Sequence, residues 1–350
     1  MGVRKRVVRE LGAPLKRFQI VIGLVAVWSI AVSGSLVGAA GATSEQSTAS
    51  RAKHDRTVAF WTHARVAKAV PRDFVFDSSS KSFKPTANLA GSGSSTVKGT
   101  SWTAGGEVLR TTGKVLFAMG SSYYVCSASV VDDTVAGRSI ILTAAHCAYN
   151  EVTKAFATNW LFIPDYDSAP AALTTSGSFC ASTTFGCWTA SALVVHNGYA
   201  SAGGFNTQAT THDFAFAVVE AGGKSGTSQL DTSVGGHPIK FSTVASNTNT
   251  HLFGYPAAGN YYGYDLVYCR GSLGSDTQNA KLTYKVACNM TGGSSGGPWF
   301  APFVSGSGTL MSVNSYTYQG GSSMYGPKFN TKTAALFSTA ATAVANTIVS

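Results

Sequence analysis

Three short stretches of the chain contain residue types that can carry out nucleophilic chemistry. Ser295 stands in a run with four glycines, and glycine lets a backbone adopt turns that bring its N–H groups close to a ligand. His146 follows the apolar run Ser139–Leu142, and Asp213 precedes the apolar run Phe214–Val219. A serine hydroxyl is a weak nucleophile until a base removes its proton, so a serine, a histidine and a carboxylate brought together would allow acyl transfer.

Each stretch by itself has a plainer explanation. His146 alone would fit a buried structural histidine, Asp213 a turn cap, and Ser295 one of several Gly/Ser loops. A carboxylate at the mouth of an apolar strand needs a partner, because burying it alone is costly. The ordered run Gly-x-Ser-Gly-Gly-Pro, close to a cysteine-bearing strand, favours the chemical interpretation.

Together the three stretches resemble the chymotrypsin-like (trypsin-fold) serine peptidases. The matching residues are Thr143-Ala144-Ala145-His146-Cys147, Asp213 before its apolar strand, and Gly293-Ser294-Ser295-Gly296-Gly297-Pro298, in the family's order His, Asp, Ser. The resemblance covers roughly residues 106–335, and Cys288–Ser295 is closest to secreted bacterial members, including the glutamyl endopeptidase branch. It implies a secreted serine endopeptidase that acts on polypeptides and is made as a zymogen, with no cofactor and no resident metal.

The resemblance also assigns roles to the site residues. His146 would be the general base, Asp213 would orient it, Ser295 would be the nucleophile, and the N–H groups of Gly293 and Ser295 would form the oxyanion hole. Ser294 is a rival nucleophile, but only Ser295 is followed by Gly-Gly-Pro. Many animal members carry an acidic residue where this chain has Ser294, so their activation switch is not expected here.

The substrate pocket is predicted from the same family pattern. Its base falls six positions before the nucleophile, at Asn289, and the strand after the nucleophile supplies Asn314, Ser315 and Tyr316. None of these residues is a carboxylate or a histidine. The pocket is therefore expected to be neutral and polar, and to accept uncharged side chains before the cut.

Six cysteines all lie after residue 125, which in an exported chain predicts three disulfides among 15 formal pairings. The resemblance pairs Cys126 with Cys147 across the histidine loop, and sequential pairing joins the others as Cys180–Cys187 and Cys269–Cys288. Zinc is not expected, because no Cys-x-x-Cys pair has a matching histidine pair. A surface calcium at Asp165 and Asp167 stays open.

The elements that must position these residues read as short alternating strands broken by Gly, Ser, Asn and Asp, which predicts an all-β fold. With the resemblance, this becomes two packed antiparallel β-barrels with a C-terminal helix over Thr333–Ile348. The first barrel, 101–230, would carry His146 and Asp213, and the second, 231–350, would carry Ser295. About 67 residues separate His146 from Asp213, an interval that suggests an inserted hairpin or loop near the cleft.

The N-terminal hundred residues have a different character. Six basic residues precede the uncharged run Ile20–Ala42, which predicts a signal peptide over 1–42 cleaved after Ala40-Gly41-Ala42; a retained membrane anchor is the alternative. Residues 43–100 are basic and poor in strand alternation, so they fit either a disordered arm or a pro-segment. The catalytic motifs favour the pro-segment.

Composition narrows the remaining classes of function. The chain is 44% hydrophobic and 12% charged, which excludes disorder, and the net charge of +10 lies entirely outside residues 101–350. No nucleic-acid partner is therefore expected. We also expect no membrane partner once the leader is cleaved, and we expect the enzyme to be a monomer. Two other functions compete with this one. The chain could be a catalytically inactive family member, or a sugar-binding β domain, for which its 14 tyrosines and 6 tryptophans are suited.

Overall fold

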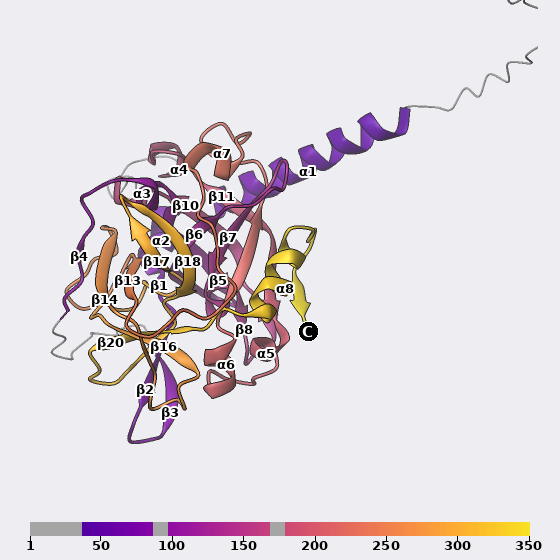
Figure 1. Ribbon diagram of the computed structural model, residues 1–350. Coiled ribbons are helices and arrows are strands. Elements are labelled where there is room, and N and C mark those ends of the chain that lie inside the picture. The colour runs from indigo at the N-terminus through magenta and orange to yellow at the C-terminus, as the bar shows by residue number, and fades with distance from the viewer. Residues whose placement is uncertain (1–36, 87–96, 169–178) are drawn as a thin grey trace, which may run out of the picture. The chain divides into compact units, whose positions relative to one another are not determined.

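The computed structural model describes residues 37–86, 97–168 and 179–350 (Figure 1). By its internal contacts the chain divides into two units, Met1–Thr43 and Ser44–Ser350, and all strands and helices after α1 belong to the second. The predicted leader lies outside the described residues up to Val37, where helix α1 (Val37–Phe60) begins. Within the described ranges, no helix is both long and apolar enough to cross a membrane.

A closed six-stranded barrel forms the first half of the fold. Its strands follow the order β6-β5-β10-β11-β12-β7, and β7 pairs back with β6; their bounds are β5 (Thr112–Met119), β6 (Ser122–Val131), β7 (Ser139–Thr143), β10 (Thr158–Pro164), β11 (Trp188–His196) and β12 (Ala215–Val219). Neighbouring strands of the ring are antiparallel. Closure removes the unpaired edges that an open sheet would expose.

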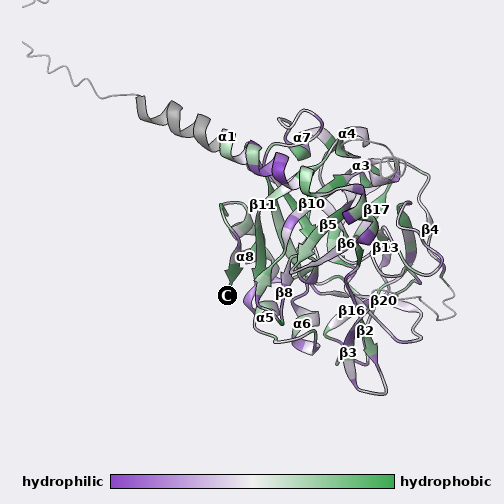
Figure 2. Cartoon of the chain, turned by 180° about the vertical axis from the view of Figure 1, so that it is seen from behind, coloured by the Kyte–Doolittle hydropathy of each residue, from purple (hydrophilic) through white to green (hydrophobic). Residues whose placement is uncertain are grey.

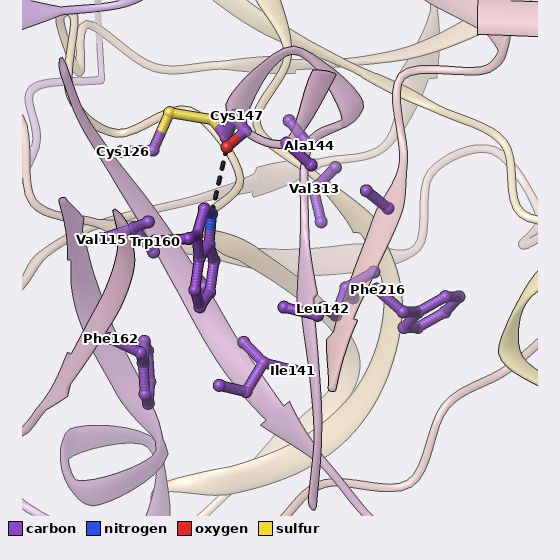
Figure 3. Close-up of a cluster of buried hydrophobic side chains, with 14 of the residues drawn as sticks. Val115, Cys126, Ile141, Leu142, Ala144, Cys147, Trp160, Phe162, Phe216 and Val313 are labelled. Carbon is purple, nitrogen blue, oxygen red and sulfur yellow. Dashed lines mark hydrogen bonds between the residues drawn. A yellow bond between two sulfur atoms is a disulfide. The ribbon is translucent and has the colours of Figure 1, made fainter. Parts of the chain in front are cut away.

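Large apolar side chains fill this barrel. Ile141, Trp160, Phe162 and Phe216 come from three of its strands, β7, β10 and β12, and are at most 3% exposed (Figure 3). Every residue of β5, β7 and β12 is buried, which accounts for their nearly continuous apolar sequence. The hydropathy colouring of Figure 2 likewise shows hydrophobic residues gathered on the strands, β11 among them.

The second half is built from two sheets that share one core. One contains β4 (Thr100–Ser101), β13 (Asn249–Gly254), β14 (Val267–Ser272), β17 (Pro298–Val304) and β18 (Ser307–Val313). The other contains β15 (Gly274–Ser275), β16 (Thr283–Ala287), β19 (Tyr316–Tyr318) and β20 (Ser323–Pro327), together with β2 (Asp73–Asp77) and β3 (Ser82–Thr86). Leu252, Trp299 and Met311 of the first sheet pack with Val286 and Met324 of the second. The molecule is thus all-β with a trypsin-like architecture, as predicted.

The C-terminal helix is shorter than predicted. Helix α8 spans Thr331–Ala340, capped by Asn330, and Ile348 lies instead in β21 (Thr347–Val349), which pairs in parallel with β11. The four-residue spacing was misleading beyond Ala340, because Val344 is 78% exposed and continues no buried face. The remaining elements are short: α3 (Glu107–Thr111), α4 (Phe179–Ser182), α5 (Asn197–Ala200), α6 (Thr207–Thr211), α7 (Leu230–Val234), β8 (Tyr149–Asn150) and β9 (Ala155–Phe156).

Residues 44–86 fold onto the rest of the unit, so a disordered arm, the alternative to a pro-segment, does not describe them. Helix α2 (His63–Lys68) and strands β1 (Val70–Pro71), β2 and β3 follow α1. Strand β1 pairs with β6 and β2 pairs with β19, both in parallel, while Trp61 is buried and donates to the carbonyl oxygen of Asn159 at 2.7 Å. Because β1 and β2 pair with partners far along the chain, local sequence patterns did not reveal them.

Candidate active site

His146 lies in a one-turn 3₁₀ helix, Ala145–Cys147, that directly follows β7. The turn is held from two sides: Cys147 forms a disulfide with Cys126 of β6, and the Trp160 indole N–H donates to the Cys147 carbonyl oxygen at 3.1 Å (Figure 3). His146 is fully buried. The barrel core therefore fixes the position of the imidazole through its neighbour in the chain.

Asp213 reaches His146 because of the strand register between β12 and β7. Ala215 pairs with Thr143, so the residues just before β12 lie beside those just after β7. The Asp213 carboxylate accepts the His146 backbone N–H at 2.9 Å and lies 2.8 Å from the imidazole Nδ1, and it also accepts the Ser315 hydroxyl at 2.5 Å. These contacts satisfy a fully buried carboxylate and hold the ring with Nε2 directed away from it.

The loop around Ser295 needs its glycines for steric reasons. Gly293 and Gly296 have φ of +94° and +79°, and a Cβ on Gly296 would lie 2.2 Å from the Thr143 hydroxyl. Asn314 holds the loop through two hydrogen bonds. Its side-chain amide donates to the Ser294 carbonyl oxygen at 2.9 Å, and its backbone carbonyl oxygen accepts the Gly296 N–H at 2.8 Å. The Ser294 hydroxyl donates to the Thr291 carbonyl oxygen at 2.8 Å.

Ser295 and His146 are not hydrogen-bonded in this structure. The Ser295 hydroxyl donates instead to Oδ1 of Asp73 at 2.5 Å, and the Gly293 N–H donates to Oδ2 of the same carboxylate at 3.0 Å. Among the described residues, the buried Nε2 of His146 finds no hydrogen-bond partner. Asp73, from the N-terminal segment, thus binds the Ser295 hydroxyl in place of His146.

Asp73 is a site residue that the sequence interpretation missed. It begins β2, is 5% exposed and is followed by Phe74, which stacks on Phe205 at 4.0 Å and meets the His146 ring edge-on at 5.5 Å. Burial raises the pKa of the Asp73 carboxyl, while His146 and the hydrogen bonds from Ser295 and Gly293 act to lower it. One sequence feature could have indicated Asp73: the charged pair Arg72-Asp73 directly precedes the apolar run Phe74–Phe76.

Arg72 makes a second contact with the same region. Its guanidinium donates to the His146 carbonyl oxygen at 2.5 Å and to the Glu151 carboxylate at 3.0 Å. The Tyr199 hydroxyl donates to Glu151 at 2.8 Å. Beside this pair lies a cavity of about 600 Å³, lined from the N-terminal segment and from Asn150–Thr153.

The four predicted pocket residues have different surroundings. Asn314 and Ser315 lie against the nucleophile loop and Asp213, as described above, and Tyr316 pairs with Phe74 across β19 and β2. The Tyr316 hydroxyl donates to Asp276 at 2.6 Å. Asn289 accepts the Gly99 N–H at 2.7 Å and the Tyr261 hydroxyl at 2.8 Å. The role of all four in substrate selection stays a prediction.

The six cysteines form three disulfides, which bears on whether they could bind a metal. The bonds are Cys126–Cys147, Cys180–Cys187 and Cys269–Cys288, the three pairs predicted. Within the described residues, the one group of three close metal-ligand side chains is Cys126, His146 and Cys147. Its two sulfur atoms are bonded to each other, so they are not thiolate ligands.

Comparison with solved structures identifies the family. The protease Anisep from Arthrobacter nicotinovorans is 37% identical with a TM-score of 0.55, and the match covers 96% of that chain and 67% of this one. The thermostable serine protease AL20 from an extremophilic microorganism is 34% identical with a TM-score of 0.56, and the match covers 99% of it and 67% of this chain. A Glu endopeptidase, 17% identical with a TM-score of 0.51 over 97% of its length and 70% of this chain, shares the fold.

No family model matches the chain, and no curated protein sequence does. The identity with these two proteases, one of them a serine protease, over nearly their whole length is nevertheless decisive. The chain belongs to the chymotrypsin-like (trypsin-fold) serine peptidases. It is a serine-type endopeptidase, a hydrolase whose substrates are polypeptides.

Proposed function

We propose that this endopeptidase cleaves peptide bonds through an acyl-enzyme, with Ser295 as nucleophile, His146 as base and Asp213 as the group that orients the base. The observation that carries the proposal is the hydrogen-bonded pair of Asp213 and His146, buried beside the Ser295 loop. Ser295 Oγ attacks the substrate carbonyl carbon as His146 Nε2 takes its proton. The N–H groups of Gly293 and Ser295 stabilise the oxyanion, and His146 then protonates the leaving amine. Water hydrolyses the resulting ester by the same steps in reverse roles.

The enzyme is exported and matures outside the cytoplasm. Three disulfides support this, because such bonds persist in oxidising compartments. The basic and apolar N-terminus supports a leader cleaved near Ala42. Residues 43–100 act as a pro-segment, and the mature enzyme works as a monomer with no membrane attachment.

The full-length chain is an inactive precursor, and Asp73 is the group that keeps it so. Its carboxylate takes the Ser295 hydroxyl away from His146 and occupies the Gly293 N–H that an oxyanion would need. Strand β2 pairs with β19 from Phe74 to Phe76, so the segment is also held by strand pairing just after Asp73. A side-chain carboxylate is a poor electrophile and contains no peptide bond, so Ser295 cannot cleave the group that blocks it.

Labelling with a fluorophosphonate probe tests this proposal on the full-length chain. We expect the mature band to react rapidly and the wild-type precursor band slowly. Asp73→Ala should speed labelling of the precursor about tenfold or more, because the charge-assisted contacts to Ser295 and Gly293 are lost. Asp77→Ala, at the far end of the same strand, is the matched control and should label like wild type.

Each outcome is informative. Equal labelling of wild-type and Asp73→Ala precursors would contradict inhibition by Asp73 without affecting the catalytic assignment. A mature protein that never reacts with the probe would contradict the catalytic assignment itself. Asp73→Asn should fall between the two, since an amide oxygen still accepts the Gly293 N–H but carries no charge.

A further inference from the structure

A buried ion pair joins the N-terminal segment to the catalytic body beside the base. Arg72 and Glu151 are 8% and 2% exposed, and the guanidinium meets Glu151 and the His146 carbonyl oxygen through two different nitrogens. Both acceptors belong to one short stretch, since Glu151 lies five residues after His146. The catalytic body therefore supplies a preformed site for a guanidinium.

Removal of the segment would leave this site without its cation. Glu151 would keep the Tyr199 hydroxyl as a donor, and Phe205 lines the same cavity. A carboxylate in such surroundings, with no positive partner, is unfavourable and attracts a cationic group that enters the cleft. The His146 carbonyl oxygen would lose the guanidinium donor in the same circumstance.

We propose that Glu151 and the His146 carbonyl oxygen form a subsite for a basic side chain of the substrate, on the leaving-group side of the cleaved bond. The inference rests on the proposed function, in which the pro-segment leaves and His146 protonates the leaving amine. That amine must reach His146, and Glu151 belongs to the segment that continues from the histidine turn. Arg72 occupies the subsite in the precursor and is replaced there by the substrate.

Arginine should be preferred to lysine at this position. The two acceptors receive hydrogen bonds from separate nitrogens of one planar group, and a single ammonium does not reproduce that fork. The preference concerns a residue after the cut. It is therefore independent of the neutral pocket expected around Asn289, which concerns the residue before the cut.

The test compares arginine with citrulline, which has the same shape but no charge. Mature enzyme, processed from the full-length precursor, is assayed on quenched peptides that carry either residue first or second after the cut. We expect kcat/KM to be about tenfold higher with arginine at one of these positions, as a charge-assisted hydrogen bond implies, with lysine between the two.

Glu151→Gln should abolish this difference, so that arginine and citrulline peptides are cleaved with equal kcat/KM. Asp265→Asn is the control, because Asp265 is an exposed carboxylate that accepts the Ser101 hydroxyl, and it should keep the arginine preference. Glu151→Asp serves if the glutamine variant does not fold, and should reduce the preference without removing it.

Two results would overturn the inference. Equal rates on arginine and citrulline peptides in the wild type would mean that Glu151 serves only to hold the pro-segment. A preference that survives Glu151→Gln would locate the cation site elsewhere. Either result requires an active enzyme, so both differ from a protein that cleaves no peptide, which would contradict the proposed function instead.

Discussion

At the scale of single residues, two adjacent serines have clearly different surroundings. Ser294 donates its hydroxyl to the backbone of its own loop, at Thr291, whereas Ser295 directs its hydroxyl to Asp73 beside His146. Both are almost fully buried, so exposure does not separate them. The hydrogen-bond partner does, and it favours Ser295 as the nucleophile.

Ser295→Ala should remove peptidase activity and leave the fold intact. The expected loss is on the order of 10⁶-fold in kcat, the size found when the nucleophile of a serine protease is deleted. Ser294→Ala should keep most activity, because it loses one hydrogen bond within the loop. Steady-state kinetics with circular dichroism on both variants provide the check, and the reverse pattern would show that the motif register is wrong.

Lys114 is a buried cation outside the catalytic group. Its ammonium donates to the Gly263 carbonyl oxygen at 2.8 Å and lies 4.5 Å from the centre of the Tyr166 ring. Burial lowers its pKa to about 8. Below pH 8 the lysine is charged in both folded and unfolded states, so the fold bears the full cost of burial. That cost is relieved as pH rises from about 8 toward the ordinary value of 10.5.

Lys114→Met should therefore raise the free energy of unfolding at pH 7, by at most about 3 kcal/mol. The advantage over the parent should shrink between pH 8 and 10.5, the interval between the two pKa values. Denaturant unfolding in a Ser295→Ala background, which prevents self-digestion, measures both quantities. A difference that stays constant across this pH range would contradict the assignment of the cost to the charge.

At the scale of elements, the histidine turn depends on the barrel that surrounds it. The register of β12 on β7 delivers Asp213, and the Cys126–Cys147 bond ties the turn to β6. The Cys180–Cys187 bond closes a shorter loop, with a sequence separation of 7 against 21. The two bonds should therefore contribute differently to stability and to activity.

Replacing Cys126 and Cys147 by alanine should lower the free energy of unfolding by about 3 kcal/mol, and replacing Cys180 and Cys187 by about 2 kcal/mol. Only the replacement of Cys126 and Cys147 should also reduce kcat, because Cys147 is next to His146 in the chain. Thermal unfolding and kinetics of the two double variants are the measurements. A larger loss of kcat from the second pair would argue against this account of how the base is positioned.

At the scale of the whole molecule, the N-terminal segment is part of the folded unit and also covers its active site. Strands β1, β2 and β3 complete two sheets, while Asp73 and Arg72 contact the catalytic residues. For the proposed pro-segment, activation would require both a cut and the separation of paired strands. A precursor that is cut but still holds its segment should remain inactive.

The active form in culture supernatant should have lost most of residues 43–100. The physical reason is that Asp73 must leave before the Ser295 hydroxyl can turn to His146. Intact-mass analysis with N-terminal sequencing of probe-labelled protein locates the first residue. A labelled species that still begins near Thr43 would rule out the second cut.

Much of the fold and site followed from the sequence alone. The His146, Asp213 and Ser295 motifs, the three disulfide pairs and strands such as β7 were predictable, because local composition and a family pattern are sufficient for them. The sequence interpretation failed at Ile348. The helical spacing of apolar residues continues to this residue, but the buried face of the helix does not.

Only the tertiary structure could decide what the N-terminal segment does. Asp73 lies 222 residues from Ser295 along the chain, and Arg72 lies 79 residues from Glu151. Contacts between residues so far apart in sequence produce no local sequence pattern, because pairing between remote strands depends on the shape of the folded barrel. The sequence predicts the chemistry that the site can perform, whereas only the folded chain shows that Asp73 contacts the Ser295 hydroxyl and that Arg72 contacts the His146 carbonyl oxygen.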